Sequence, residues 1–232
     1  MRLGIMQPYF FPYIGYFQLI NAVDVFVLYD DVQYIKNGWI NRNRMLVNGK
    51  PCYFTMQIKK SSTFDKINQK ELLNFDYDKI KFFKSMEMSY RRAPYYNDVL
   101  PVLQQSMMTD TVKISELACN SIKTVCNYLG IKTYLVKASE FDVSDDLNAA
   151  YRVIWFNKKL NSNHYINTSY GESLYSKEVF EKHDIKLNFL QTKDIRYIQY
   201  GNEYVQDLSI IDVLMFNSKS EVMSLLDQYE LI

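Results

Sequence analysis

The hydrophobic positions at the start of the chain fall into short runs with different spacings. Leu3 to Met6 is a brief apolar run that predicts a strand, and residues 15–22 suit a helix. Asp24 to Tyr29 predicts a second strand, and its uninterrupted apolar middle is typical of a strand buried on both faces. The order strand, helix, strand predicts that the chain opens with a βαβ unit.

The second half of the chain repeats this alternation of helical and strand patterns. Helical spacing runs from Ile114 to Leu129, where Gly130 provides a stop. The segments predicted after it are 133–137 (strand), 148–160 (helix), 164–167 (strand), 176–183 (helix), 185–189 (strand), 210–216 (helix) and 221–229 (helix). Helices that alternate with short strands predict crossover connections and a largely parallel sheet.

Residues 39–105 follow a different pattern and predict an insertion. Asn48-Gly49 separates two apolar, β-favouring runs, which is a strong signal for an antiparallel hairpin. Residues 64–105 suit helices separated at Arg92-Ala93-Pro94. We therefore predict an α/β fold with a mostly parallel, Rossmann-like sheet and an inserted β-hairpin and helical region. A single domain of residues 1–232 would contain 39–105 as this inserted subregion.

Composition and charge exclude several classes of protein. The 232 residues include 27 basic and 26 acidic ones, a net charge of +1, whereas extended nucleic-acid binding needs a larger basic excess. Three cysteines and two histidines lack ligand spacing, so we predict neither a disulfide framework nor a metal site. The residues after Met1 do not read as a signal sequence, and the chain has no 18-residue apolar run. We expect a cytoplasmic protein without a membrane span.

Polar side chains gather at the ends of three predicted strands. Gln7 follows the first strand, Asp30 and Asp31 follow the second, and Thr168 and Ser169 follow a later one. Because ligands bind beyond the carboxyl ends of the strands in open parallel sheets, these groups are expected at one edge. The chain is also 16% aromatic, with twenty tyrosines whose faces suit sugar rings and bases. We therefore predict a ligand site at this edge.

The first strand end has competing interpretations. Gln7 either presents its amide to a ligand or satisfies loop backbone groups. Tyr13 and Tyr16, spaced as Tyr-Ile-Gly-Tyr, occupy the histidine positions of the His-x-Gly-His motif of nucleotidyl-transferring α/β enzymes. They lie at a predicted helix start, whose N–H groups favour anions. Tyrosine can donate a hydrogen bond to phosphate, but it carries no positive charge at neutral pH. A sheet like that of the nucleotidyltransferases with the His-x-Gly-His (HIGH) motif therefore stays one alternative within the fold class.

A dense polar cluster follows the second predicted strand. Asp30 and Asp31 can accept from an amine or hold a metal, while Lys36 and Arg42 can bind phosphate. The alternative is a solvated connection with exposed salt bridges worth ~0–1 kcal/mol each. The segment SYRRAPYY, residues 89–96, predicts either a diphosphate clamp or a surface turn.

Five segments together resemble the WbqC-like family: MQPYFFPYIGYFQLI, DVFVLYDDVQYIKNGWINRNRM, RRAPYY, YINTSYGESLY and LSIIDVLMFN. The resemblance runs in order along almost the whole chain. Members of that family are found in bacterial gene clusters for O-antigen (lipopolysaccharide) and other surface polysaccharides. The founding member is thought to attach glycine or a related acyl group to the amine of a nucleotide-linked amino-dideoxy sugar. One departure is Tyr170, which precedes Gly171 where relatives often have two adjacent glycines.

The resemblance implies acyl or aminoacyl (glycyl-type) transfer to such an amino sugar in surface polysaccharide biosynthesis. It also implies a set of shared residues, which fall on Gln7, Tyr13, Gly15, Tyr16, Asp30, Asp31, Gln33, Lys36, Asn41, Arg42, Tyr95, Gly171 and Tyr175. Asp30 or Asp31 is then the candidate base or amine-orienting group. Lys36, Arg42 and Arg91 are the candidate diphosphate ligands, and Ser169 joins the substrate-binding edge.

Two other functions remain alternatives. A non-catalytic nucleotide-sugar-binding or assembly protein fits the lack of an obvious nucleophile, and nucleotidyl transfer is disfavoured because both motif histidines are tyrosines. The predicted partners of a transferase are the nucleotide-linked amino sugar and an acyl or aminoacyl donor. That donor stays open among an adenylate made from ATP with Mg²⁺, a thioester and a charged carrier. The sequence identifies neither the sugar, the acyl group nor the oligomeric state.

Overall fold

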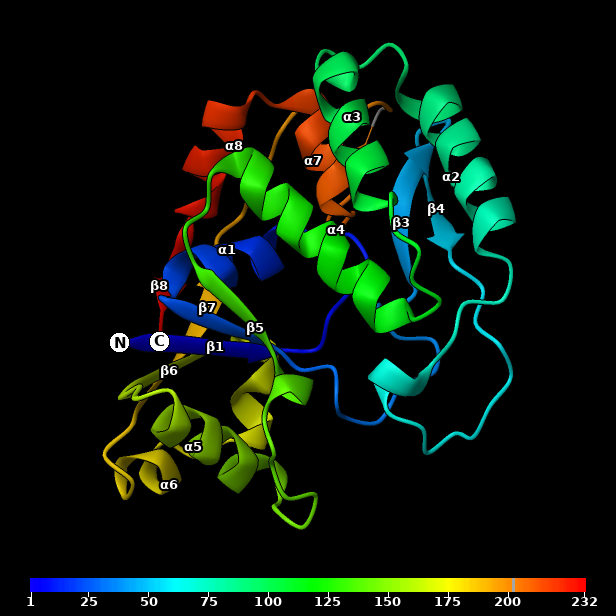
Figure 1. Ribbon diagram of the computed structural model, residues 1–232. Coiled ribbons are helices and arrows are strands. Elements are labelled where there is room, and N and C mark those ends of the chain that lie inside the picture. The colour runs from blue at the N-terminus through cyan, green and yellow to red at the C-terminus, as the bar shows by residue number, and fades with distance from the viewer. Residues whose placement is uncertain (202) are drawn as a thin grey trace.

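One six-stranded sheet organises the molecule, in a computed structural model that describes residues 1–201 and 203–232 (Figure 1). Its strands, in spatial order, are β5 (Tyr134–Lys137), β2 (Val25–Leu28), β1 (Arg2–Met6), β6 (His164–Thr168), β7 (Lys186–Thr192) and β8 (Tyr229–Leu231). The first five pair in parallel, and β8 runs antiparallel to β7. The predicted α/β fold with a mostly parallel sheet is confirmed.

The sheet separates two hydrophobic layers, because alternate residues of its central strands point to opposite faces. Phe26 and Leu28 pack into one layer, whereas Val25 and Val27 pack into the other. The helices of the first layer are α1 (Ile14–Ala22), α4 (Ile114–Leu129), α7 (Ile210–Phe216) and α8 (Lys219–Leu226), and those of the second are α5 (Ala149–Lys159) and α6 (Lys177–Glu181) (Figure 1). Across the described ranges, no helix has the length and apolar character needed to cross a membrane.

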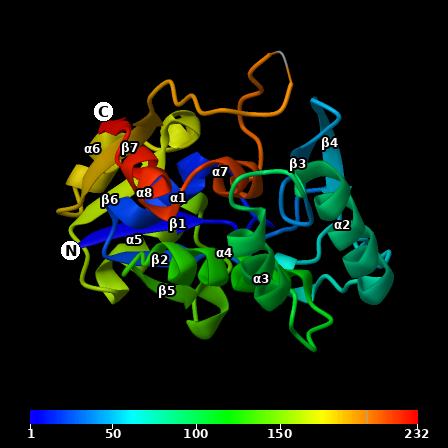
Figure 2. The same cartoon turned by 90° about the horizontal axis from the view of Figure 1, so that it is seen from above.

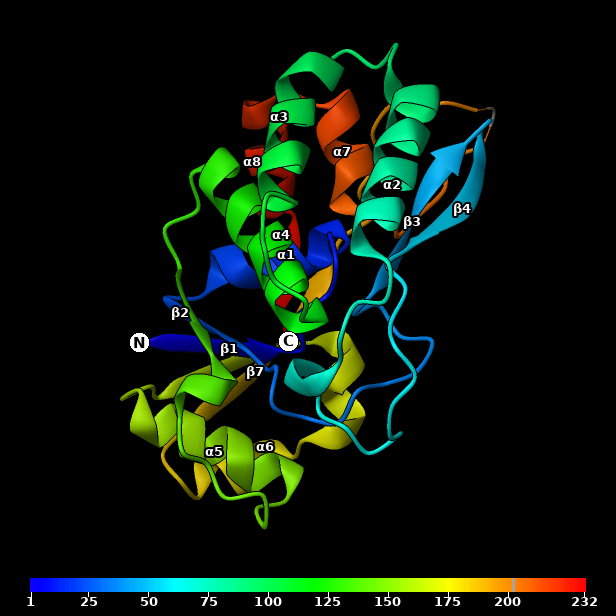
Figure 3. The same ribbon diagram turned by 45° about the vertical axis from the view of Figure 1, so that its right-hand side comes forward.

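The chain inserts a hairpin and two helices between β2 and α4. The inserted elements are β3 (Arg42–Val47), β4 (Lys50–Thr55), the 3-10 turn η1 (Ile67–Gln69), α2 (Phe75–Tyr90) and α3 (Tyr96–Ser106). At the hairpin turn, Asn48 and Gly49 have φ of 51° and 73°, which confirms the Asn-Gly prediction. The hairpin and α2 lie together beyond the carboxyl ends of β1 and β2 (Figures 2 and 3).

The order of the chain across the sheet reverses at β1. The first crossover runs through α1 to β2 on one side of β1, and a later one runs through α5 to β6 on its other side. The chain leaves the carboxyl end of β1 toward α1 on one face and the carboxyl end of β6 toward α6 on the other, so the two connections diverge between these strand ends. Such a switch point leaves a crevice in which ligands bind. Two short 3-10 segments, η2 (Ala138–Glu140) and η3 (Ser169–Leu174), follow β5 and β6.

The predicted last helix, residues 221–229, is wrong at its end. α8 starts at a capping box between Ser218 and Glu221 and stops at Leu226. Residues 229–231 instead form β8, where Leu231 pairs with Leu190 of β7. A three-residue strand is too short for its alternation to be recognised in a sequence.

Candidate functional site

The aromatic loop after β1 divides its side chains between the core and the crevice. Phe10 and Phe11 are fully buried, and the Phe11 ring stacks on Phe82 with 5.9 Å between centroids. Phe11 adopts φ of 44°, in the left-handed region that non-glycine residues rarely occupy. Tyr9 and Tyr13, on either side of this pair, line the crevice.

Polar side chains from three distant segments hold this loop by its backbone. The Asn43 amide donates to the carbonyl oxygens of Phe10, at 3.2 Å, and Phe11, at 2.8 Å. The Ser209 hydroxyl also donates to the Phe11 carbonyl, at 2.7 Å. The Phe11 N–H in turn donates to Ser121 Oγ at 3.1 Å. Because buried hydrogen bonds contribute about 0.5–1.5 kcal/mol each, the loop is a fixed wall of the crevice.

α1 begins directly behind this wall, and Gly15 allows its close approach. A Cβ on Gly15 would lie 2.5 Å from Tyr13 Cε2 and 2.9 Å from Thr192 Oγ1, so a larger residue does not fit there. Tyr16 is fully buried, and its hydroxyl donates to the Gln7 carbonyl oxygen at 3.0 Å. Of the two tyrosines in Tyr-Ile-Gly-Tyr, Tyr13 faces the crevice and Tyr16 belongs to the core.

The end of β6 forms the opposite wall. Thr168 and Ser169 line the crevice where β6 passes into η3. Gly171 folds this turn back onto the strand, since a Cβ at that position would lie 2.3 Å from Asn167 Nδ2. Tyr170 is 78% exposed and contributes to both parts of the crevice described below.

The connection from β7 to α7 forms the third wall of the crevice. Hydrogen bonds to α2 and to β3 hold this connection in place. Buried Asp212, in the first turn of α7, accepts from the hydroxyls of Tyr90 at 2.7 Å and Tyr197 at 2.8 Å. Arg44 of β3 donates to the carbonyl oxygen of Asp207 at 3.1 Å. These bonds fix the Asp207 backbone, which has φ of 54°, at the rim of the crevice.

Two adjoining cavities make up this site, which we call the cleft. The polar chamber has a volume of about 510 Å³, and the aromatic chamber one of about 280 Å³. They share Tyr13, Thr168, Tyr170 and Asp207. The polar chamber adds chiefly Ser169, Thr192, Lys193, Asp194, Arg196 and Tyr204, and the aromatic chamber adds Met6, Tyr9, Pro12, Trp39, Asn43 and Arg44. Volumes of this order suit small-molecule ligands.

The polar chamber carries charges of both signs. Arg196 Nε lies 3.1 Å from an Asp194 oxygen, and both side chains are exposed. Lys193 and Asp207 form no ion pair with any described residue, so both charges are available to a ligand. No group of three His, Cys, Asp or Glu that could hold a metal ion occurs in residues 1–201 and 203–232. The chamber can therefore bind an anion and a cation at once.

Tyr9, Tyr13 and Tyr204 of the cleft are neutral at physiological pH. Burial raises the pKa of Tyr9 and of Tyr13, and the proximity of Tyr170 and Asp207 adds to the rise at Tyr13. Burial also raises the pKa of Tyr204 to about 12. Their hydroxyls can therefore donate hydrogen bonds to a ligand, but they cannot supply a negative charge or act as a base near neutrality.

Comparison with known proteins places the chain in a family. A model of the WbqC-like protein family matches residues 7–224, which include all the residues that line the cleft except Met6. The chain belongs to the WbqC-like family. It is also similar to an uncharacterized protein of Mycobacterium tuberculosis, Rv1507c, with 26% identity over 223 residues that make up 95% of each chain. No solved structure matches it significantly.

In this WbqC-like protein, Asp30 and Asp31 lie at the end of β2 and outside the cleft. Asp30 accepts from the Ser139 N–H at 2.9 Å and from the Ser139 hydroxyl at 2.7 Å. Asp31 forms a buried ion pair with Arg152 of α5. Burial raises the pKa of the Asp31 carboxyl, and the Arg152 charge opposes that rise. Both carboxylates thus have protein partners, and their catalytic role stays a prediction.

Four other predicted residues lie on the segment that leads from β2 into the hairpin. Lys36, Asn41 and Arg42 line a separate groove. The Gln33 amide donates to the carbonyl oxygen of Thr63, beside this groove, at 3.0 Å. None of the four lines either chamber of the cleft.

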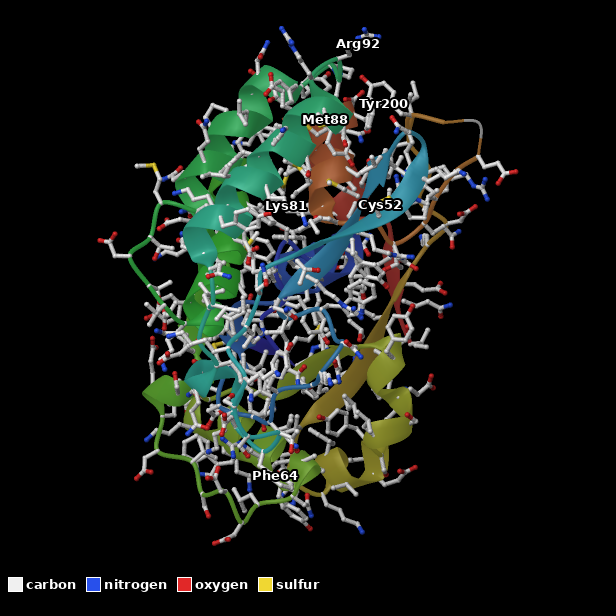
Figure 4. The ribbon with its side chains drawn as sticks, turned by 90° about the vertical axis from the view of Figure 1, so that its right-hand side faces the viewer. Cys52, Phe64, Lys81, Met88, Arg92 and Tyr200 are labelled. Carbon is white, nitrogen blue, oxygen red and sulfur yellow. The ribbon has the colours of Figure 1, made fainter. Side chains whose placement is uncertain are left out.

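The remaining predicted residues are spread over the molecule. Arg91 lines a cavity of about 820 Å³, at the end of the hairpin where Figure 4 labels Arg92 and Tyr200. Tyr95 is half-buried at the start of α3. Tyr175 packs edge-on against Tyr165, 5.9 Å between centroids, in the hydrophobic layer under α5 and α6. The structure thus brings together in the cleft Tyr13 and Ser169, with Gly15, Gly171 and the Gln7 backbone behind its walls.

Several residues of the cleft were not predicted from the sequence. Lys193 and Arg196 follow β7, so the rule that ligands bind at strand ends would have found them. Arg44 and Trp39 come together in space, with Arg44 Cζ 5.6 Å from the centre of the Trp39 ring. Asp207 lies in a polar segment without periodicity, and no pattern in the sequence signals it.

Proposed function

We propose that this protein transfers an acyl or aminoacyl group to the amine of a nucleotide-linked amino-dideoxy sugar, and that transfer takes place in the cleft. The observation that carries this is the position of Asp207, in the wall shared by two chambers of different character. A carboxylate between them suits a reaction in which an amine bound on one side meets an acyl group bound on the other.

The polar chamber would hold the sugar nucleotide. Lys193 and Arg196 are cations at the carboxyl end of β7 and would bind the diphosphate through charge-assisted hydrogen bonds. The hydroxyls of Ser169 and Thr192 lie in the same wall and would bond to sugar hydroxyls. The cations predicted from the sequence line other cavities, so this arrangement assigns the diphosphate of the sugar nucleotide to Lys193 and Arg196.

The aromatic chamber would hold the acyl group. The side chains of Tyr9, Trp39 and Tyr170 line it, together with Met6 and Pro12. Such a surface excludes water from a bound acyl chain and leaves its carbonyl at the shared wall. A small volume of about 280 Å³ suits a short acyl group such as glycyl.

The chemistry follows from the charge of an amine. A sugar amine is protonated near neutral pH and must lose a proton before it attacks. Asp207 would hold the ammonium group and accept that proton while the nitrogen bonds to the acyl carbon. The bond from that carbon to the leaving group breaks, the electron pair departs with the leaving group, and the leaving group takes up the second proton that the nitrogen loses as it becomes an amide nitrogen. The neutral hydroxyls of Tyr13 and Thr168 would donate to the oxygen that becomes negative.

Binding and turnover can be measured separately with the intact chain. UDP- and dTDP-linked amino sugars would be offered with acyl-CoA, or with glycine, ATP and Mg²⁺, and the acylated sugar sought by mass spectrometry. A sugar nucleotide at a hundredfold over its Kd should stabilise the fold by about 2.7 kcal/mol. We expect Arg196→Ala to lose this stabilisation and Asp207→Asn to keep it while losing product. Arg92→Ala, an exposed arginine outside the cleft, is the control.

A non-catalytic nucleotide-sugar-binding protein is the second candidate. It is favoured by the lining of the two chambers, which contains neither histidine nor cysteine. Stabilisation by a sugar nucleotide without product from any donor would support this binder and contradict the transferase. Equal loss of binding and of product in Asp207→Asn would also contradict the proton-accepting role of that carboxylate.

A further inference from the structure

A groove on the inserted region is separate from the cleft and shares no lining residue with it. Its volume is about 650 Å³, and its walls come from residues 34–42, residues 55–63, Lys70 and Leu73. The loop that carries Phe64 continues from this wall. Figure 4 shows that loop at the opposite end of the face from Arg92 and Tyr200, so the groove is also distinct from the cavity beside Arg91.

The lining of this groove, which we call the basic groove, contains cations and no acidic residue. The cations are Lys36, Arg42, Lys59, Lys60 and Lys70. Two of them are compensated by carboxylates from outside the lining. Lys59 Nζ lies 3.0 Å from Glu71, and Lys70 Nζ lies 3.3 Å from Asp65.

The other three cations keep their full positive charge. Lys36 and Lys60 are exposed and have no ion-pair partner in the described part of the chain. The Arg42 guanidinium donates to the carbonyl oxygens of Asn37 and, at 3.2 Å, of Gly38. These carbonyls are uncharged, so they orient the guanidinium without neutralising it. Three uncompensated positive charges therefore surround one concave surface.

The walls of the basic groove are fixed by buried polar contacts. Tyr34 donates to Asn41 Oδ1 at 2.9 Å, and the Asn41 amide donates to the Met56 carbonyl at 2.8 Å. Arg42 Cζ lies 4.6 Å from the centre of the Tyr53 ring. A guanidinium held between a ring and two carbonyls is preorganised for the planar, bidentate binding of an oxyanion.

We propose that the basic groove binds a small ligand through its ionised phosphate groups. The concave shape and volume suit a small molecule, and the hydroxyls of Ser61 and Thr63 add neutral donors. A nucleic acid is a poorer match, because the whole chain has a net charge of only +1. Resting on the proposed function, these phosphate groups belong to the acyl donor or to the nucleotide that activates it, and they are bound apart from the sugar nucleotide and from the acyl group in the aromatic chamber.

The groove is tested by isothermal titration calorimetry of the Arg196→Ala protein, in which the diphosphate site proposed for the cleft is disabled, with inorganic diphosphate, ATP and coenzyme A as ligands. Diphosphate measures the shared phosphate chemistry, and the other two probes distinguish an activating nucleotide from a thioester donor. We expect Lys36→Ala and Lys60→Ala each to weaken diphosphate binding about tenfold, and the double variant about a hundredfold. Lys84→Ala, an exposed lysine of α2 outside the groove, should leave diphosphate binding unchanged.

The possible results distinguish the proposal for phosphate binding in the groove from the proposal for acyl transfer in the cleft. Unchanged diphosphate binding when either lysine is replaced in the Arg196→Ala protein, or no diphosphate binding by Arg196→Ala itself, would overturn the proposal for the groove. Diphosphate binding that depends on both lysines, with no acylated sugar from any donor, would support the groove and contradict the transferase. An acylated product formed by the double variant with an unchanged KM for the donor would support the transferase and contradict the binding of the donor's phosphate groups in the groove.

Discussion

The carboxyl end of β2 and the carboxyl ends of β1 and β6 are both polar, yet they are used differently. At β2, Asp30 is bonded to Ser139 and Asp31 to Arg152, so both carboxylates are buried against protein partners. At β1 and β6, the corresponding groups face an open cleft. A polar residue at a strand end is thus only a candidate for ligand binding, and the neighbouring elements decide whether it is free.

The direction of the crossover connections explains this difference. β5 lies beside β2, and the turn after β5 supplies Ser139, while α5 supplies Arg152 from the face below. Between β1 and β6 the connections leave to opposite faces, so no helix covers the gap. The order of the strands and their connections produces the cleft. The polar residues at the end of β2 instead bind that strand end to the turn after β5 and to α5.

The largest expected effect is on stability, at the β2 end. Arg152→Ala would leave the Asp31 charge buried and unpaired, since the two side chains are only 7% and 10% exposed. We expect the free energy of unfolding to fall by about 3–5 kcal/mol, measured by urea denaturation. Lys158→Ala, exposed on the same helix, should change it by less than about 0.5 kcal/mol. If Arg152→Ala lowered the free energy of unfolding by less than about 1 kcal/mol, the ion pair between Asp31 and Arg152 would not stabilise the end of β2.

The next effect is on turnover, at the cleft. Asp207→Asn removes the proton acceptor, and we expect the rate of acyl transfer to fall about a hundredfold or more with stability unchanged. Asp31→Asn should do the reverse, lowering stability and leaving the turnover of folded protein intact. If Asp31→Asn or Asp30→Asn abolished turnover in a stably folded protein, the catalytic carboxylate would lie at β2 as the sequence predicted.

A third expectation concerns the wall formed by η3. In Gly171→Ala the new Cβ would meet the Asn167 amide, so we expect a loss of about 1–3 kcal/mol in the free energy of unfolding. Removing the obstructing group as well, in Gly171→Ala with Asn167→Ala, should recover part of that loss in a double-mutant cycle. Strictly additive losses would mean that the two residues do not press on each other.

The two tyrosines of Tyr-Ile-Gly-Tyr offer a matched pair. Tyr13→Phe removes a hydroxyl from the cleft and should lower turnover about tenfold without loss of stability. Tyr16→Phe removes a buried hydrogen bond to the Gln7 carbonyl, so it should cost about 1 kcal/mol of stability with turnover retained. Kinetics and thermal unfolding of both variants measure the contrast, and identical behaviour would contradict it.

The smallest effect is a pH dependence of the protein's stability, which arises from Asp212, the residue that anchors the loop carrying Asp207. Burial raises the pKa of Asp212 above its unfolded value of about 3.9, although the Tyr90 and Tyr197 hydroxyls oppose the rise. Ionising Asp212 therefore costs more in the folded state, and its contribution to stability declines as pH rises from about 3.9 through the folded pKa. Relative to Asp212→Asn, the unaltered protein should lose stability over this range in thermal unfolding. A gap between the two that is independent of pH would contradict the shift.

Much of the fold could be predicted because its signals are local. The apolar run of Val25–Leu28 and the Asn48-Gly49 turn each lie within a few residues. The three-residue strand β8 has no such signal, and only its pairing with β7 defines it. The fold class therefore followed from periodicity, and the edge strand did not.

The site was harder to predict because its groups meet over long separations. Asp31 and Arg152 are 121 residues apart, so nothing near Asp31 shows that its charge is already paired. Arg44 reaches the Asp207 backbone across 163 residues. The rule of strand ends located the right edge of the sheet, but it could not distinguish paired carboxylates from free ones.

A stack of two cations and two rings at the hairpin links the cleft to the basic groove. Arg44 lies over Trp39, Trp39 stacks on Tyr53 with 6.1 Å between centroids, and Tyr53 lies under Arg42. Arg44 lines the cleft and Arg42 lines the basic groove. The emission of an indole responds to nearby charges, so we expect a ligand that displaces Arg44 to change the fluorescence of Trp39 directly, and one that displaces Arg42 to change it only through Tyr53. The second tryptophan, Trp155, lies on the other side of the sheet, and Trp155→Phe would remove its emission so that the signal of Trp39 is measured alone. The fluorescence of Trp39 can therefore report whether ligands fill the cleft and the basic groove independently or together.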